Sequence, residues 1–217
     1  MTDKLSRYES DAIAVTYDVR RCLHAAECIH ALPKVFDPGR RPWIDPRAAP
    51  AAEIARIIER CPTGALKYER KDGGAPEALP HKNAIALEPD GPLCLRGAIE
   101  LLAGDGTLIA RETRVALCRC RASEYKPYCD GCHTKAGFHD AGTIRTLQVK
   151  SNAAAARPGL AVTIIPDGPL HARGTFEIVE AQSGVAYPAH ETWLCRCGAS
   201  ANKPFCDGSH KRTGFKG

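Results

Sequence analysis

The sequence contains no long hydrophobic run, because no stretch of 18 uncharged apolar residues occurs in its 217 residues. A transmembrane helix is therefore not expected. The net charge is also small, at +5, because 30 Lys and Arg residues are nearly balanced by 25 Asp and Glu residues. No basic run is present, so the sequence gives little support to nucleic-acid binding. Residues 1–12 are polar and partly acidic, unlike a secretory or transit signal. We expect a cytoplasmic protein that binds neither nucleic acid nor membrane.

Common motifs of enzyme active sites are missing as well. The chain has no G-x-G-x-x-G, P-loop, G-x-S-x-G or H-E-x-x-H pattern. We therefore expect no enzymatic activity, and the chemistry must be sought elsewhere in the sequence.

Cysteine, in contrast, is abundant. Eleven cysteines are present, an odd number, and disulfides rarely persist in the cytoplasm. Metal binding is the more economical explanation for this content. It would also stabilise small domains, whose hydrophobic cores contribute little stability alone.

The second part of the chain is a tandem duplication. Residues 84–139 align without a gap with residues 161–216 at an offset of 77, with 23 identities in 56 positions. We divide the chain into an N-terminal domain (1–75), a first repeat (80–145) and a second repeat (158–217). The segments 71–82 and 150–159, rich in Gly, Ala and Pro, are the predicted linkers.

Each repeat contains the same four potential metal ligands. A C-x-C pair is followed by a third Cys nine positions later and by a His four positions after that. Both cysteines of C-x-C can reach one metal centre, because residues i and i+2 of an extended segment point to the same side. Asp130 and Asp207 are expected to cap a short helix that carries the His at its third position. The candidate ligands are Cys118, Cys120, Cys129 and His133 in the first repeat and Cys195, Cys197, Cys206 and His210 in the second.

The spacing alone leaves the metal open. Zinc accepts sets of three Cys and one His, although usually from C-x(2–4)-C knuckles, whereas iron–sulfur clusters also use Cys and His. Two cysteines fall outside these sets. Cys94 aligns with His171 of the other repeat and is predicted to be a small buried residue. The pattern leaves open whether Cys132, beside His133, has a ligand or redox role.

The segments CRCRASEYKPYCDGCH (118–133) and CRCGASANKPFCDGSH (195–210) resemble the CDGSH iron–sulfur domain of the mitoNEET-type family. The second copy matches the family pattern throughout, and the first departs from it at Cys132. The resemblance implies one 2Fe–2S cluster in each repeat, held by the four ligands named above. It also implies an α+β protein in which the two repeats pair as a mostly-β sandwich. With both motifs in one chain, we expect a monomer with an internal pseudo-two-fold axis.

The N-terminal domain has a different pattern. We predict a strand over 13–17, a helix over 50–60 and a closing strand over 66–69. Cys22 and Cys28 are separated by five intervening residues, and Cys61 is followed by Pro62, as in the Cys-Pro ending of bacterial ferredoxin motifs.

The segments CLHAAEC (22–28), VFDPGRRPWI (35–44) and CPTGALKY (61–68) resemble the divergent single-cluster ferredoxin-like domain. This resemblance implies a 3Fe–4S or 4Fe–4S cluster on Cys22, Cys28 and Cys61. Ala25 stands where a ferredoxin has its middle cysteine, so three cysteines favour 3Fe–4S unless His24 or water completes a 4Fe–4S site. A degenerate domain that has lost its cluster is the alternative.

Together these features predict an iron–sulfur protein that acts in electron transfer or redox sensing, with an unknown redox protein as its partner. Two alternatives remain: storage and transfer of clusters to apo-proteins, and a zinc-stabilised interaction module. The sequence does not identify the electron donor, the acceptor or the pathway.

Overall fold

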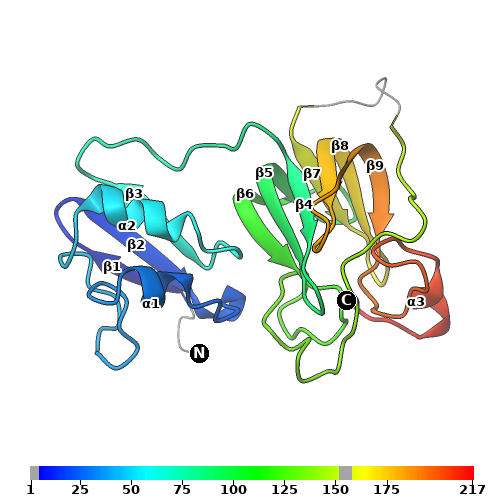
Figure 1. Cartoon of the computed structure of the whole chain (residues 1–217), viewed down its shortest axis with the longest axis horizontal. Helices are drawn as coiled ribbons and strands as arrows, with labels where there is room; N and C mark the ends of the chain where they lie inside the picture. The colour runs from blue at the N-terminus through cyan, green and yellow to red at the C-terminus, as the bar shows by residue number, and fades with distance from the viewer. Residues whose placement is uncertain (1–4, 152–157) are drawn as a thin grey trace. The chain divides into compact units, whose positions relative to one another are not determined.

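The chain divides by its internal contacts into two units, Met1–Ala78 and Leu79–Gly217. The computed structural model describes residues 5–151 and 158–217. Residues 1–4 of the first predicted domain and 152–157 of the second predicted linker lie outside the described residues. Figure 1 shows both units, with the strands of the second unit in green to orange. The structure is mostly β with few helices, which agrees with a β-rich fold.

The first unit is a three-stranded antiparallel sheet, in the order β1-β2-β3, packed against a helix. The helix α2 places Ile54, Ile57 and Ile58 in the core, where they meet the inward side chains of β2, including Ile13 and Val15. The predicted strands and helix are confirmed, whereas β1 was not predicted. The elements are β1 (Leu5–Glu9), β2 (Ile13–Asp18), η1 (Val19–Arg21), α1 (Glu27–Ala31), α2 (Ala51–Ile58) and β3 (Leu66–Arg70).

In the second unit each repeat contributes three strands. The first repeat supplies β4, β5 and β6, and the second supplies β7, β8 and β9 in the same order. The elements are β4 (Ala84–Leu87), β5 (Leu93–Leu102), β6 (Leu108–Leu117), β7 (Leu160–Ile164), β8 (Leu170–Val179), β9 (Ala186–Leu194) and α3 (Ser209–Arg212).

The repeats share two strands, because β4 and β7 each pair with the central strand of both repeats. One edge of β5 pairs with β6, while its other edge pairs first with β4 and then, in parallel, with β7 of the other repeat. The strand β8 repeats this arrangement, pairing first with β7 and then in parallel with β4. The change of neighbour occurs at Gly97 in β5 and near Gly174 in β8, whose φ angles of 137° and 133° favour glycine.

The core of this unit includes alternate residues of the central strands β5 and β8. Leu95 and Ile99 of β5, and Ala172 and Phe176 of β8, are buried in one hydrophobic cluster. No cysteine belongs to this cluster.

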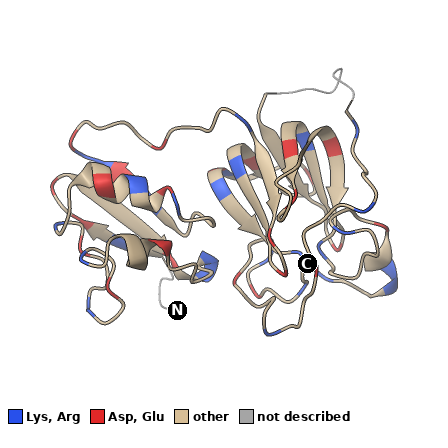
Figure 2. Cartoon of the chain, viewed as in Figure 1, with Lys and Arg blue, Asp and Glu red and all other residues tan. Residues whose placement is uncertain are grey.

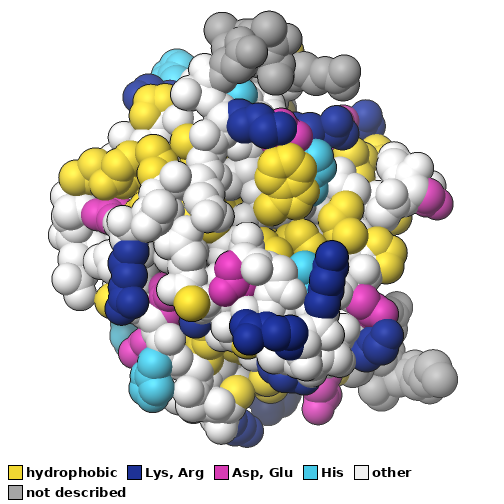
Figure 3. All heavy atoms as spheres, turned by 90° about the vertical axis from the view of Figure 1, so that its right-hand side faces the viewer, with side chains coloured by type: hydrophobic (Ala, Val, Ile, Leu, Met, Phe, Trp, Pro, Cys, Tyr) yellow, Lys and Arg dark blue, Asp and Glu magenta, His cyan; other side chains and the backbone are white. Residues whose placement is uncertain are grey.

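The surface does not favour one sign of charge. Figure 2 shows acidic and basic positions interleaved along both units, and the face in Figure 3 shows them mixed with hydrophobic side chains. Within residues 5–151 and 158–217, no helix has the length and apolar character needed to cross a membrane.

Candidate metal centres

The two cysteines of each C-x-C motif lie with their sulfur atoms close together. The Sγ atoms of Cys118 and Cys120 are 3.6 Å apart, and those of Cys195 and Cys197 are also 3.6 Å apart. All four residues are buried. This separation suits two thiolates bound to one tetrahedral metal ion, because metal–sulfur bonds are about 2.3 Å long.

The third cysteine and the histidine of each motif form a second pair. Sγ of Cys129 lies 3.3 Å from Nδ1 of His133, and Sγ of Cys206 lies 3.4 Å from Nδ1 of His210. Both histidines are half-buried, so part of each residue is accessible to solvent. The Nδ1 atom is thus the nitrogen that each ring turns toward its cysteine.

These donors come together as pairs and not as larger groups. Among the described residues, no three Cys, His, Asp or Glu side chains converge on a point where a single metal ion could bind. Each repeat therefore offers two donors from C-x-C and two from the Cys–His pair. Two such pairs would suit two metal ions that share a core, because each ion would take two of the four donors.

The loop between the two donor pairs is built the same way in both repeats. The backbone N–H of Cys195 donates to the carbonyl of Pro204 at 2.8 Å, and the Ser200 hydroxyl donates to the carbonyl of Phe205 at 2.7 Å. The first repeat has the matching bonds from Cys118 to Pro127, at 2.9 Å, and from Ser123 to Tyr128, at 2.7 Å. Ser123 and Ser200 are buried, so these bonds fix the fold of the loop.

Asp130 and Asp207, at equivalent positions of the two repeats, close the same loop, but not as helix caps. One carboxylate oxygen of Asp207 accepts from the N–H of Ala201 at 2.8 Å, and the other accepts from that of Ser209 at 2.9 Å. The predicted helix is present only in the second repeat, where α3 has four residues and His210 is its second. Its N-cap is Gly208, with a left-handed backbone and no side-chain cap.

The equivalent part of the first repeat, residues 131–137, forms turns. There the carboxylate of Asp130 accepts from Glu124 at 2.9 Å and from Cys132 at 3.1 Å. The prediction of an Asp-capped helix in both repeats is therefore wrong. In both repeats the carboxylate joins the part of the ligand loop before the third cysteine to the residues just after it.

Burial makes most of the ligand thiols difficult to ionise alone. It raises the pKa of Cys129 and of Cys195 to about 12. In Cys118 a hydrogen bond from Cys120 dominates and, with backbone N–H groups, lowers the pKa to about 6. Buried thiols of this kind need a nearby cation to become thiolates, and a bound metal core would supply it. Burial also lowers the pKa of His133, which favours the neutral imidazole that binds metals.

The two C-x-C segments meet each other across the repeats. Cys120 and Cys197 face each other in an antiparallel bridge. A Cβ atom added at Gly198 would lie 3.4 Å from the carbonyl groups of Arg119 and Cys120. The two candidate centres are thus held side by side by backbone contact.

The three cysteines of the N-terminal unit line one small cavity. The cavity has a volume of about 40 Å³ and is bordered by Cys22, Cys28 and Cys61. The N–H of His24 donates to Sγ of Cys22 at 3.4 Å. Burial raises the pKa of Cys28 to about 11, so this thiol also needs a cation to ionise. The sequence-predicted set is therefore brought together in space.

Two aromatic residues border the same cavity. Tyr17 and Trp43 pack edge to face, with ring centroids 4.8 Å apart. Trp43 is half-buried against the hydrophobic core and also lines the cavity. Tyr17 was not predicted to lie here, although its place at the end of β2, five residues before Cys22, could have indicated it.

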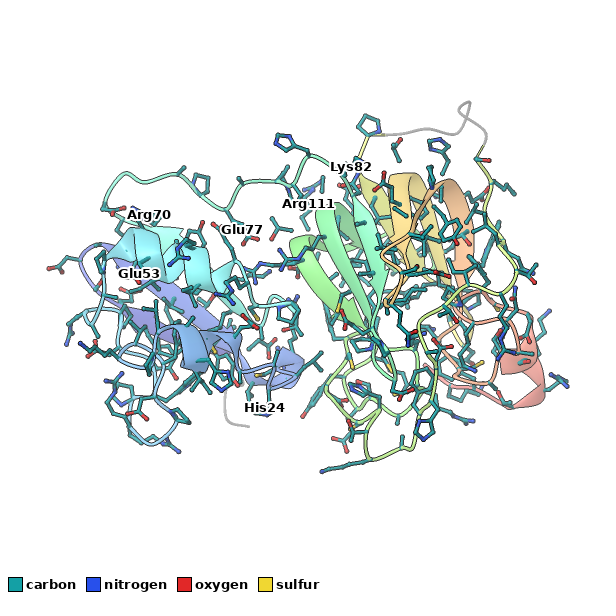
Figure 4. The ribbon with its side chains drawn as sticks, in the orientation of Figure 1. His24, Glu53, Arg70, Glu77, Lys82 and Arg111 are labelled. Carbon is teal, nitrogen blue, oxygen red and sulfur yellow. The ribbon has the colours of Figure 1, made fainter. Side chains whose placement is uncertain are left out.

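The position at which a ferredoxin has its middle cysteine is exposed to solvent in this protein. Ala25 is exposed in the loop between η1 and α1, and its neighbours His24 and Ala26 both have left-handed backbone angles. Figure 4 shows His24 on this loop, and its side chain is exposed. The loop contributes no fourth cysteine to the cavity.

Comparison with known families matches both parts of this description. The family described as divergent 4Fe-4S mono-cluster matches residues 8–71, and the iron-binding zinc finger CDGSH type matches residues 90–134 and 167–211. The chain therefore contains two domains of the CDGSH iron-binding type. In front of its two CDGSH motifs it carries the divergent 4Fe-4S mono-cluster domain, as the sequence predicted.

Two curated relatives are similar to a shorter stretch of this CDGSH protein. Each is named "Uncharacterized protein YjdI", one from Escherichia coli K12 and one from Escherichia coli O157:H7. Each is 36% identical over 64 residues, which is 30% of this chain and 84% of the relative.

The two remaining cysteines of the CDGSH unit lie close to the first centre. Cys94 is half-buried on β5 opposite Ala116, and burial raises the pKa of its thiol to about 12. Cys132 occupies the place that Ser209 has in the second repeat. A hydrogen bond with Asp130 raises the pKa of Cys132. Neither residue forms one of the donor pairs.

Proposed function

We propose that this protein is an electron carrier with two 2Fe–2S clusters in its CDGSH repeats and a 4Fe–4S or 3Fe–4S cluster in its N-terminal unit. The observation that carries the proposal is the division of each four-donor set into two pairs. Each iron of a 2Fe–2S core takes two protein ligands, and histidine replaces cysteine on one iron in some such centres. When bound, each cluster would accept and donate single electrons.

The roles of the chain's own residues follow from their positions. In each repeat the C-x-C thiols would hold one iron and the Cys–His pair the other. In the N-terminal unit Cys22, Cys28 and Cys61 would hold three irons of the larger cluster. The backbone β-bridge between Cys120 and Cys197 keeps the two CDGSH centres adjacent, which supports electron exchange between them.

The proposal extends to the assembly of the protein. The pairing of β4 with β8 and of β7 with β5, each between the two repeats, supports a pseudo-dimer in which the repeats form a sandwich within one chain. We further propose that the chain is a cytoplasmic monomer without enzymatic activity of its own, and that it exchanges electrons with another redox protein.

Anaerobic purification followed by iron and sulfide analysis, visible absorbance and EPR of the reduced protein tests this function. We expect a coloured protein with iron and acid-labile sulfide, and signals from two 2Fe–2S centres. Cys120→Ser should remove the first of these signals and Cys197→Ser the second. Cys94→Ser is the matched control, because it changes a nearby cysteine outside the donor pairs. A colourless protein with stoichiometric zinc would contradict the proposal and favour the zinc-stabilised module.

A second function, transfer of clusters to apo-proteins, is favoured by the half-buried His133 and His210. Solvent reaches the histidine side of each centre, where a cluster would be released. Incubation with an apo-ferredoxin distinguishes the two functions. Rapid, reversible reduction with the clusters retained favours electron transfer, and loss of iron and sulfide to the acceptor favours cluster donation.

A further inference from the structure

The middle residue of each C-x-C motif is a buried arginine. Arg119 and Arg196 are each 2% exposed, although arginine is almost never fully buried without partners. Because side chains alternate along an extended segment, each arginine points away from the two thiols beside it. The ligand pattern does not require arginine at this position, so its burial in both repeats calls for a structural role.

Arg119 connects three parts of the first repeat. Its Nε donates to the carbonyl of Gly91 at 2.7 Å, and Nη2 donates to the carbonyl of Glu88, so both bonds reach the turn between β4 and β5. Its Nη1 donates to the carboxylate of Asp140. The guanidinium carbon also lies 5.2 Å from the ring centroid of Phe138.

Arg196 makes the equivalent contacts in the second repeat. It donates to the carbonyl of Gly168 at 2.9 Å, of Ile165 at 2.6 Å and of Gly217 at 2.8 Å. Its guanidinium carbon lies 5.2 Å from the ring centroid of Phe215. Every one of these partners is displaced by 77 residues from its counterpart in the first repeat.

The contacts join the two ends of each ligand loop. The arginine belongs to the C-x-C end, whereas Phe138 and Asp140 follow the ligand His133 by five and seven residues. The N–H of Phe138 donates to the carbonyl of His133 at 3.1 Å, and that of Phe215 donates to the carbonyl of His210 at 3.2 Å. A planar guanidinium therefore links the segment that carries two thiols to the segment that follows the histidine.

We infer that Arg119 and Arg196 are positioning residues that hold the Cys–His donor pair at a fixed place relative to the C-x-C pair. This inference rests on the proposed binding of 2Fe–2S clusters. The arginine link between the C-x-C segment and the segment after the histidine occurs in both repeats, although fewer than half of the aligned positions are identical. Its retention in both copies indicates that the site requires it. Lysine cannot replace arginine here, since its single nitrogen cannot reach acceptors on both sides at once.

The test compares Arg119→Gln and Arg119→Lys with wild-type full-length protein. EPR of the reduced protein and visible circular dichroism follow cluster content during incubation with an iron chelator. We expect the first centre to be lost about tenfold faster in both variants, with altered EPR g-values. The second centre should keep its wild-type rate. In Arg196→Gln we expect the opposite result: the second centre is lost faster, and the first keeps its wild-type rate.

Arg121→Gln is the matched control. Arg121 lies on the other side of Cys120 and is exposed, so the variant removes the same charge without breaking the link. We expect the wild-type rate of cluster loss. A double-mutant cycle with Asp140→Asn adds a second control, because partners in one link should give non-additive effects on the rate.

The outcomes separate this inference from the proposed function. If wild-type protein contains no 2Fe–2S cluster, the proposed function fails. If wild-type protein holds both clusters and Arg119→Gln loses the first at the wild-type rate, the positioning role is wrong. If Arg119→Lys fully restores retention and g-values, the charge alone is needed and the positioning role is also wrong.

Discussion

At the scale of single residues, the histidine in each donor pair determines how much negative charge the protein places on the centre. A neutral imidazole replaces a thiolate, and fewer negative ligands raise the reduction potential of an iron–sulfur centre. We therefore expect His210→Cys to lower the potential of the second centre, by on the order of a hundred millivolts. A redox titration monitored by EPR measures the change, and the first centre should be unaffected.

The control for this prediction is Ser209→Cys. It adds a sulfur atom beside His210 without replacing a donor, and it reproduces in the second repeat the Cys132 of the first. We expect no change in potential. An equal shift in Ser209→Cys and His210→Cys would show that the ligand charge is not the cause.

The donors could be predicted from the sequence because their spacing repeats and their residue types carry the chemistry. The buried arginines could not, since most of their partners are backbone carbonyls about 30 residues away, which have no residue-specific signature. The only indication in the sequence was that the same residue type, arginine, occupies the middle position of C-x-C in both repeats. The role of Asp130 and Asp207 was predicted wrongly from a local capping pattern, because each carboxylate also accepts from an N–H six residues earlier in its ligand loop and neither is the cap of a helix.

At the scale of elements, the glycine at each change of strand partner allows β5 and β8 to join both repeats. A Cβ atom at Gly174 would lie 2.1 Å from the carbonyl oxygen of Gly159, and the φ of 133° is strained for any other residue. We expect Gly174→Ala to destabilise the second unit by about 3 kcal/mol or more, because backbone atoms must move. Chemical denaturation followed by far-UV circular dichroism measures this loss.

Gly106→Ala provides the comparison for Gly174→Ala. Gly106 also has a positive φ, of 89°, but no atom lies within 4 Å of an added Cβ. We expect a cost of about 1–2 kcal/mol from the backbone conformation alone. Equal losses in the two variants would mean that the close approach of Gly174 to Gly159 is unimportant.

The strands themselves were predictable from alternating hydrophobic residues, such as Leu93, Leu95 and Ile99 on one side of β5. Their partners were not. The sequence of either repeat is equally compatible with pairing inside that repeat, and the parallel pairing of β5 with β7 depends on contacts about 60 residues apart. Duplication indicated that the repeats associate, but not which edges they share.

At the scale of the whole molecule, β4 and β7 each pair with strands of both CDGSH repeats, so the two repeats form one sheet. Neither repeat can lose its strands without removing a neighbour from the other. We therefore expect the unit 79–217 to unfold in one transition, with both 2Fe–2S centres lost together. The first unit has its own core, so its unfolding should be separate.

Gly174→Ala tests this coupling, because it changes only the second repeat. On heating under anaerobic conditions, EPR of samples reduced after each step should show both 2Fe–2S signals disappearing at the same lowered temperature. The cluster of the N-terminal unit should be lost at its wild-type temperature, since residues 1–78 form a separate contact unit. Earlier loss of the second centre alone would show that the repeats unfold independently, in spite of the shared strands. Earlier loss of all three clusters would instead indicate that the two units unfold together.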